Sequence, residues 1–283
     1  MISIIICTKH GRIPIKLKDN ITSTIGCDYE IVCIDNSENH YSIFQAYNKG
    51  VSLAKGDILC FMHDDIHILT PNWGKLVKQH LCDKVGLIGV IGNHLLPNCP
   101  ASWWTTSMRS GHIIQRNLTD DRSYDILFDL YKSSSLNYSE VVTIDGLWFC
   151  MPKKIFEEVH FDEKTFSGFH CYDSDICMQT LMMGYSVRTI FDITIEHYSI
   201  GSLDKQFFAQ RQLWYEKWEQ HLPIVRGISL SPNELMIVTE MSKLSNELLE
   251  EKTWAEEENK RIKNSHAYKL GETILKPIKW LKK

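Results

Sequence analysis

The chain has 283 residues, of which 43% are hydrophobic and 23% are charged, and its 8 Trp, 11 Tyr and 11 Phe are enough for a substantial core. This composition excludes fibrous and wholly disordered proteins. The 31 Lys and Arg residues against 35 Asp and Glu residues give a formal net charge of −4. Because this balance creates no overall positive field, we expect no nucleic acid among the partners.

The first part of the chain alternates between short apolar runs and segments with helical spacing. Nearly continuous apolar runs predict buried strands over residues 2–7, 29–35, 57–62 and 85–91. The intervening segments predict helices over residues 15–25, 41–54 and 71–82. This alternation is typical of an α/β domain in which a mostly parallel mixed sheet is flanked by helices.

Ligands of such α/β sheets gather at the carboxyl ends of the strands. The first three predicted strands are followed there by Cys7-Thr8-Lys9, Asp35-Asn36-Ser37 and His63-Asp64-Asp65. All three ends are polar and two are acidic. We therefore expect the functional site at this edge of the sheet.

The middle of the chain is less regular. Residues 93–138 are predicted to form a long irregular stretch that contains the pair Trp103-Trp104. Long irregular stretches within a domain are usually functional loops or lids. Regular structure is predicted to return as strands and helices over residues 141–144, 173–183, 186–191, 194–197 and 204–220.

Composition changes after Pro223, and we predict a main domain over residues 1–222 and a helical extension over residues 223–283. Residues 231–263 carry apolar side chains at an approximate heptad spacing, which fits either a short coiled coil joining two copies of the chain or a solvated helix packed on the main domain. The final residues, 265–283, are basic and amphipathic. They fit either contact with a membrane surface or docking on the protein itself or on a partner.

The chain has nine cysteines, an odd number, and no two of them form a C-x-x-C pair. Several lie in apolar runs, where a thiol packs as a small hydrophobic group. This argues against a disulfide scaffold or a zinc module and fits a reducing cytosol. The first residues turn polar too early for a signal peptide, and no apolar run approaches the ~20 residues that cross a bilayer. We expect a cytoplasmic protein, at most peripheral at the inner face of the cell membrane.

The sharpest local motif is GDILCFMHDD, residues 56–65, in which a buried strand is followed at once by adjacent acids. Paired carboxylates in this position can bind a hard divalent cation, which can neutralise substrate phosphates. The structural alternative is a helix N-cap before Thr70-Pro71.

Two later motifs also have two interpretations. In YDSDICMQTLMMGYSV, Asp173 or Asp175 could act as a general base, or both could stabilise the start of a helix. In IEHYSIGS, His197 follows directly on a predicted strand. A lone histidine is more often structural, but beside an acidic site it becomes a candidate metal ligand.

Six motifs in chain order together resemble a family 2 glycosyltransferase of the GT-A fold, over about residues 1–220: ISIIICTKH, IVCIDNS, AYNKGVSLAKGDILCFMHDD, DGLWFCMPKKIF, YDSDICMQTLMMGYSV and IEHYSIGS. An ordered set of this kind is much harder to obtain by chance than any one motif. The GVIG segment followed by WW and GH most resembles the bacterial capsular or cell-surface polysaccharide branch.

The resemblance implies an inverting transferase that uses a nucleotide-diphospho-sugar and Mn²⁺ or Mg²⁺. The implied donor-binding positions are Thr8, Asp35, Asn48, Gly50, Asp64 and Asp145. The implied metal ligands are Asp65, His197 and His63. His63 is a departure, because the D-x-D motif of the family usually begins with an acid.

Asp173 corresponds to the catalytic base, and Asp175 is the alternative base or a helix cap. The residue before the base is Tyr172 here, where the family usually has an acid. Trp103 and Trp104 could stack on the acceptor sugar, although paired tryptophans are more often core residues. The resemblance thus predicts that three distant acids converge on one pocket: Asp35, Asp65 and Asp173.

The implied acceptor is a hydroxyl group of a cell-surface glycan or of its lipid-linked precursor. One alternative is a member that binds nucleotide-sugars without turning them over and serves as an assembly partner through residues 231–263. A sugar nucleotidyltransferase is a weaker alternative, because CTKHGRIP lacks the glycine density of a phosphate-binding loop.

Overall fold

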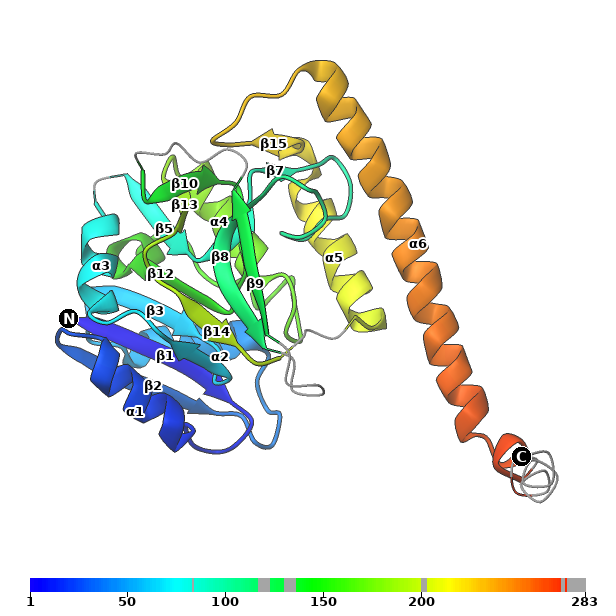
Figure 1. The fold of residues 1–283 in the computed structure, drawn as a ribbon, viewed down its shortest axis with the longest axis horizontal. Coiled ribbons are helices and arrows are strands. Elements are labelled where there is room, and N and C mark those ends of the chain that lie inside the picture. Colours follow the sequence, from blue (N-terminus) through cyan, green and yellow to red (C-terminus); the bar gives the residue numbers. More distant parts are fainter. Residues whose placement is uncertain (83, 117–122, 130–135, 200–202, 271–272, 274–283) are drawn as a thin grey trace. The chain divides into compact units, whose positions relative to one another are not determined.

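The computed structural model describes residues 1–82, 84–116, 123–129, 136–199, 203–270 and 273. Two compact units divide the chain, Met1–Ser242 and Lys243–Lys283. The first unit contains the described sheets and the helices that pack on them (Figure 1). The residues of the candidate site also belong to this unit. The domain boundary predicted between residues 222 and 223 stays a prediction.

Within the described residues, the first unit is built on a seven-stranded mixed sheet in the order β10-β13-β5-β12-β3-β1-β2. Its strands are β1 (Ile2–Thr8), β2 (Tyr29–Asp35), β3 (Ile58–Met62), β5 (Val85–Gly89), β10 (Tyr138–Val141), β12 (Trp148–Pro152) and β13 (Ser186–Ile190). The β1 strand pairs in parallel with both β2 and β3, whereas β12 is antiparallel to β3 and β5. The predicted mixed α/β fold is confirmed.

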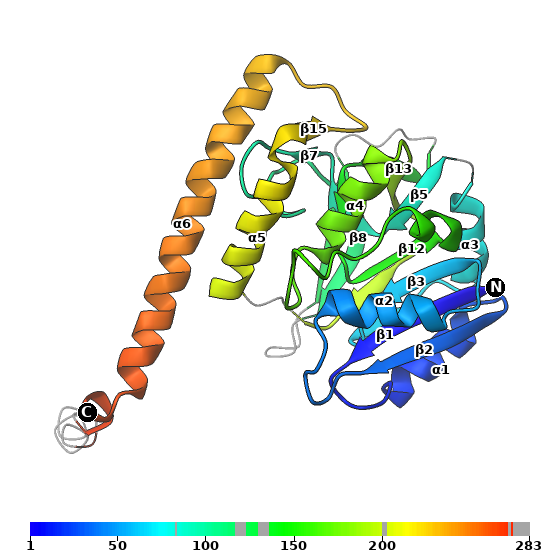
Figure 2. The same cartoon turned by 180° about the vertical axis from the view of Figure 1, so that it is seen from behind.

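The helices of the first unit cover both faces of this sheet. They are α1 (Ile15–Thr24), α2 (Ile43–Leu53), α3 (Trp73–His80), α4 (Tyr172–Met182) and α5 (Lys205–Trp218), with 3-10 turns η1 (Lys153–Glu157) and η2 (Glu219–His221). The α2 and α4 helices lie on one face of the sheet, and α1 and α3 lie on the other (Figure 2). Ile5 of β1 belongs to the core cluster that includes residues of α2 and α4, while Ile4 and Ile6 belong to the cluster that includes residues of α1 and α3. Burial on both faces explains why β1 is a continuous apolar run.

A second sheet has the strand order β11-β6-β8-β14-β4, and β9 pairs with β8. Its strands are β4 (Ile66–Ile68), β6 (Ile91–Asn93), β8 (Arg109–Arg116), β9 (Ser123–Asp129), β11 (Thr143–Ile144) and β14 (Ile195–His197). Two short strands, β7 (Leu95–Leu96) and β15 (Ile224–Val225), pair separately. The prediction that residues 93–138 are irregular was wrong for the antiparallel β8–β9 pair, because polar and apolar side chains intermingle in RSGHIIQR and SYDILFD.

The predicted C-terminal helix is present as α6 (Pro232–Asn264), and the side chain of Glu234 accepts hydrogen bonds from Ser231 at its start. Met241 is 66% exposed, and Leu244 and Leu248 are each 57% exposed. These side chains are available for contact with a second copy of the chain, but a single chain does not test that contact, so the coiled coil stays a prediction. Most of the predicted membrane-contacting segment lies outside the described residues. No described helix is both long enough and apolar enough to cross a membrane.

Candidate functional site

A cavity of about 830 Å³ lies at the carboxyl ends of β1 and β3, where the strand order predicts a ligand site. Its lining comes from segments far apart in the sequence. It includes eight of the residues singled out by the sequence: His63, Asp64, Asp65, Trp103, Trp104, Asp145, Asp173 and His197.

Three of these residues form a cluster that could hold a metal ion: His63, Asp65 and His197. The Nδ1 atom of His63 and the Nε2 atom of His197 each lie 3.8 Å from Oδ1 of Asp65. These separations are too long for hydrogen bonds. An ion with bonds of about 2.0–2.2 Å places neighbouring ligand atoms roughly 3–3.6 Å apart, so a small adjustment suffices. Burial lowers the pKa of His63 and so favours the neutral imidazole that binds metals.

The fold orients His197 through a residue that the sequence did not single out, Gln115 of β8. The Nδ1 atom of His197 lies 3.1 Å from Oε1 of Gln115, whose Nε2 donates to the carbonyl oxygens of His197 and Ser199. If Nδ1–H donates to Gln115, Nε2 carries the lone pair that a metal ion can take, in place of its 3.4 Å contact with Oγ of Ser199. The parallel pairing of β8 with β14 creates this contact.

Asp64 is held from the first strand. The Oγ1 atom of the buried Thr8 donates to Oδ2 of Asp64 at 2.5 Å, so Thr8 supports the cavity wall from behind. Asp35 lies opposite Thr8 in the β1–β2 register, but it is exposed and does not line the cavity. The predicted convergence of three acids is therefore corrected: Asp65 and Asp173 share the cavity, and Asp35 lies outside it at the same sheet edge.

Asn48 and Gly50, expected at the donor site, are not brought to the cavity. The carboxamide of Asn48 donates to the carbonyl oxygen of Phe161 and accepts from its backbone N–H. A Cβ atom on Gly50 would lie 2.3 Å from Cγ2 of Ile5, so this glycine permits α2 to pack closely on β1. Both residues instead hold α2 in place.

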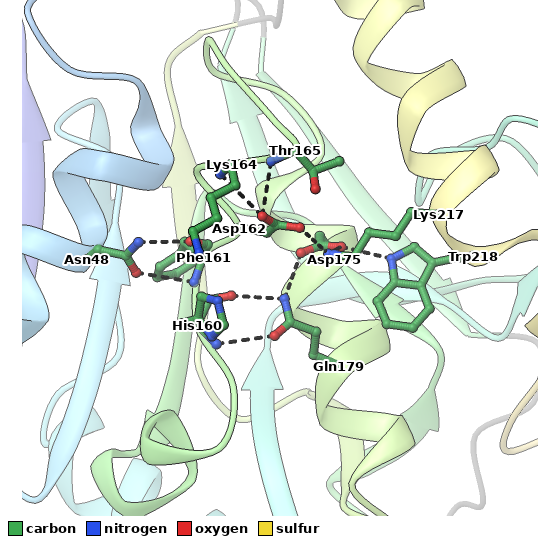
Figure 3. Close-up of polar contacts among 10 residues, drawn as sticks. All are labelled: Asn48, His160, Phe161, Asp162, Lys164, Thr165, Asp175, Gln179, Lys217 and Trp218. Carbon is green, nitrogen blue, oxygen red and sulfur yellow. Dashed lines mark hydrogen bonds and ion pairs between the residues drawn. The ribbon is translucent and has the colours of Figure 1, made fainter.

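Asp175, the alternative base, also does not line the cavity. Its buried carboxylate accepts hydrogen bonds from Nε1 of Trp218 at 2.8 Å and from Nε2 of Gln179 at 2.7 Å (Figure 3). Lys217 pairs with Asp175 and with Asp162, each at 2.8 Å (Figure 3). The interactions of Asp175 tie α4 to α5 and hold its carboxylate away from the cavity. Asp173 therefore remains as the candidate base.

Asp173 lies in the first turn of α4 and lines the cavity. Its Oδ2 accepts from the backbone N–H of Gly146 at 2.9 Å, and its Oδ1 accepts from that of Ser174 at 2.8 Å. Burial, and then the negative charge of Asp145, raise the pKa of Asp173 to about 7. A carboxylate with a pKa near 7 is well matched to proton abstraction near neutral pH.

An aromatic wall lines the remaining part of the cavity. Trp103 and Trp104 are half-buried, and the ring of Trp104 stacks on that of Phe207 with centroids 6.0 Å apart. Phe169 and His170 also line the cavity. Trp103 also packs against the core, so the two tryptophans combine a core contact with a surface that faces the cavity.

The model of the glycosyltransferase-like family matches residues 3–211. The structure of GalNAc-T7 with UDP, GalNAc and Mn²⁺ aligns with a TM-score of 0.52 and 14% identity, over 78% of this chain and 47% of that chain. This chain thus spans less than half of that protein. The mannosyltransferase PcManGT from Pyrobaculum calidifontis, in complex with GDP-Man and Mn²⁺, aligns with a TM-score of 0.44 and 12% identity, over 96% of this chain and 83% of that chain. No curated protein matches the sequence.

The family match covers most of the chain and contains each cavity residue named above. The alignment with GalNAc-T7 independently supports the fold. The chain belongs to the glycosyltransferase-like family and has the GT-A fold that its ordered motifs predict.

Proposed function

We propose that the protein is an inverting glycosyltransferase that moves a sugar from a nucleotide-diphospho-sugar to a hydroxyl group of an acceptor. One observation carries the proposal: the carboxylate of Asp173 and the metal-binding cluster of His63, Asp65 and His197 line the same cavity. Attack by a hydroxyl group calls for a base, and departure of a diphosphate calls for positive charge.

Asp173 takes the proton of the acceptor hydroxyl group. The acceptor oxygen forms a bond to the anomeric carbon from the face opposite the nucleotide, and the bond from that carbon to the diphosphate oxygen breaks. The electron pair of that bond leaves with the diphosphate, and the single displacement inverts the anomeric configuration through an oxocarbenium-like transition state. The hydrogen bonds from Gly146 and Ser174 keep the carboxylate oriented for this transfer.

His63, Asp65 and His197 fit a divalent cation, which we propose to be Mn²⁺ or Mg²⁺. The structure of GalNAc-T7, which shares the fold, contains Mn²⁺ together with UDP. When bound, such an ion supplies positive charge for the departing diphosphate.

Other residues of the cavity support the binding of the two substrates. Asp64, held by Thr8, and Asp145 offer carboxylate oxygens to the hydroxyl groups of the donor sugar. Asp35, exposed at the end of β2, is proposed to meet the nucleobase outside the cavity. Trp103 and Trp104 present apolar faces to the acceptor.

We propose a cell-surface glycan or a lipid-linked precursor as acceptor, modified at the cytoplasmic face of the membrane. The resemblance of the motifs to a polysaccharide branch of the family supports this choice. Under the same proposal, residues 265–283 contact the membrane surface and the exposed apolar side chains of α6 join two copies of the chain.

The test combines binding with turnover. UDP-, GDP- and dTDP-sugars are screened by thermal shift with and without Mn²⁺, where a ligand at 100 times its Kd should stabilise the protein by roughly 2.7 kcal/mol. The best donor is then used in hydrolysis and transfer assays. Metal-dependent turnover supports the proposal, and donor binding without turnover favours the non-enzymatic alternative. Failure of every donor to bind contradicts both.

A further inference from the structure

The hydroxyl group of Tyr172 lies 2.9 Å from Nε2 of His63. Tyr172 is the first residue of α4, directly before Asp173, and only 6% of it is exposed. His63 and Tyr172 are the two positions at which the motifs depart from the pattern of the family. The fold brings these two departures into contact across 109 positions of the chain.

This contact bears on which nitrogen of His63 can face a metal. A neutral imidazole has one N–H donor and one acceptor nitrogen. Nδ1 of His63 is the atom that lies 3.8 Å from Oδ1 of Asp65. When Nε2–H donates to the Tyr172 oxygen, the lone pair of Nδ1 is available to the cluster, whereas the opposite tautomer puts a proton there.

The surroundings leave the Tyr172 hydroxyl group little freedom. Its ring makes edge contacts with Phe44 and Tyr47, at centroid distances of 6.4 Å and 5.6 Å. A Cβ atom on Gly146 would lie 2.1 Å from the hydroxyl oxygen, so only glycine leaves space for it here. The hydroxyl group is therefore fixed on the side of His63 that faces away from Asp65.

We propose that Tyr172 is a positioning residue of the cation site: it accepts the hydrogen bond of His63 Nε2–H and so holds Nδ1 toward Asp65 and His197. The inference rests on the proposed divalent cation site. Tyr172 then serves His63 as Gln115 serves His197, so each imidazole of the cluster has its own hydrogen-bonding partner. Removing a hydrogen-bonding partner of this kind typically lowers metal affinity by about 10–100-fold.

The direct test is the Kd for Mn²⁺ alone, measured by electron paramagnetic resonance titration of free Mn²⁺. Tyr172→Phe removes the hydroxyl group and keeps the ring, and we expect its Kd to rise about 10–100-fold. The matched control is Tyr47→Phe, which removes a hydroxyl group from the neighbouring buried ring; among the described residues, no hydrogen bond links Tyr47 to the cluster. An unchanged Kd in Tyr172→Phe overturns the inference.

A double-mutant cycle separates positioning from general loosening of the fold. In a His63→Ala background, Tyr172→Phe should change the Kd for Mn²⁺ by less than twofold, because the residue through which Tyr172 acts is gone. A loss in that background equal to the loss in the wild type shows a merely structural role and overturns the inference.

Long-range ¹H–¹⁵N correlation spectra of the metal-free protein test the contact without the ion. The signals of His63, assigned by their absence in His63→Ala, should show the Nε2–H tautomer, and Tyr172→Phe should mix the tautomers. A predominant Nδ1–H tautomer overturns the inference.

If the wild type shows the expected tautomer and binds no Mn²⁺, the proposed cation site fails and this role of Tyr172 fails with it. If the wild type binds Mn²⁺ and Tyr172→Phe leaves the Kd unchanged, the role of Tyr172 is overturned while the proposed cation site stands.

Discussion

The backbone N–H of Gly146 donates a hydrogen bond of 2.9 Å to Oδ2 of Asp173, which ties the segment before β12 to the first turn of α4. The other carboxylate oxygen accepts from the N–H of Ser174. With both oxygens engaged, the carboxylate has a defined orientation in the cavity wall. The carboxylate of Asp175 is also held at both oxygens, but it does not line the cavity, and this difference is the reason to propose Asp173 as the base.

Asp173→Asn should therefore lower the rate of sugar transfer by about 10²–10⁴-fold, because an amide cannot accept the proton of the acceptor. The Kd for the donor should stay within a few-fold of the wild type, since the cation cluster is untouched. Steady-state kinetics and donor titration measure the two quantities. Asp19→Asn, on the exposed side of α1, is the matched control. Near-normal turnover in Asp173→Asn would refute the assignment.

The raised pKa of Asp173 also predicts a pH dependence of stability. Its pKa is about 7 in the folded protein, mainly through burial, against 3.8 for an unperturbed carboxyl group, so the folded state binds this proton more tightly. The resulting stabilisation is full below about pH 4, is lost as the pH rises to about 7, and is absent above.

Asp173→Asn does not titrate, so the Tm of the variant minus that of the wild type should increase between about pH 4 and pH 7 and then stay level. Differential scanning calorimetry without divalent cations measures this difference. A difference that is constant across the range would show that the carboxyl group has an ordinary pKa.

Lys217 should matter for stability and not for the chemistry. It pairs with Asp162 and with the buried Asp175 (Figure 3), so Lys217→Met leaves two carboxylates without their cation. We expect a loss of about 3 kcal/mol in the free energy of unfolding, measured by urea titration at pH 7. Lys75→Met, on the exposed face of α3, should change it by less than about 0.5 kcal/mol. A similar small change in Lys217→Met would contradict the structural role.

Gln115 should affect the metal and leave the fold intact. Gln115→Ala removes the partner of His197 Nδ1, and the Kd for Mn²⁺ should rise about 10–100-fold. The matched control, Gln212→Ala, removes an exposed residue of α5 that bonds only to Glu216 in the described contacts. Isothermal titration calorimetry with MnCl₂ measures both variants, and equal affinities would argue against an oriented His197.

The aromatic wall should act on the acceptor. Replacing both Trp103 and Trp104 by Ala should raise the KM for the acceptor about tenfold or more, since an aromatic contact contributes about 0.5–1.5 kcal/mol and 1.4 kcal/mol corresponds to tenfold. Donor affinity should not change. Trp254→Ala, in the other unit, is the control. A selective loss of donor affinity in the double variant would instead place the nucleotide against this wall.

Much of the fold could be predicted from the sequence, because strands buried on both faces are continuous apolar runs. The Ile4-Ile5-Ile6 run of β1 shows this, with successive side chains in opposite cores. The β8–β9 pair was missed because RSGHIIQR mixes polar and apolar side chains without a clear period. Gln115 was missed with it, since its partner lies 82 positions away.

The motifs predicted where the cavity lies, but they did not predict in which direction each candidate side chain points. Asp65 follows β3 of the seven-stranded sheet, Asp173 lies in the first turn of α4, and His197 ends β14 of the second sheet; the ends of these elements meet at the cavity. Asn48 lies on a helix, where the packing of α2 decides which way a side chain points, and it points to Phe161. Helix orientation depends on contacts between distant segments, which a motif does not encode.

In the proposed mechanism, one cavity holds both the base and the cation. A crystal structure with Mn²⁺ and the nucleoside diphosphate of the best donor, with anomalous scattering recorded at the manganese edge, tests it most directly. We expect a manganese peak about 2.0–2.2 Å from ligand atoms of His63, Asp65 and His197, with the carboxylate of Asp173 facing the same cavity. A peak elsewhere, or a nucleotide bound away from Asp173, would contradict it.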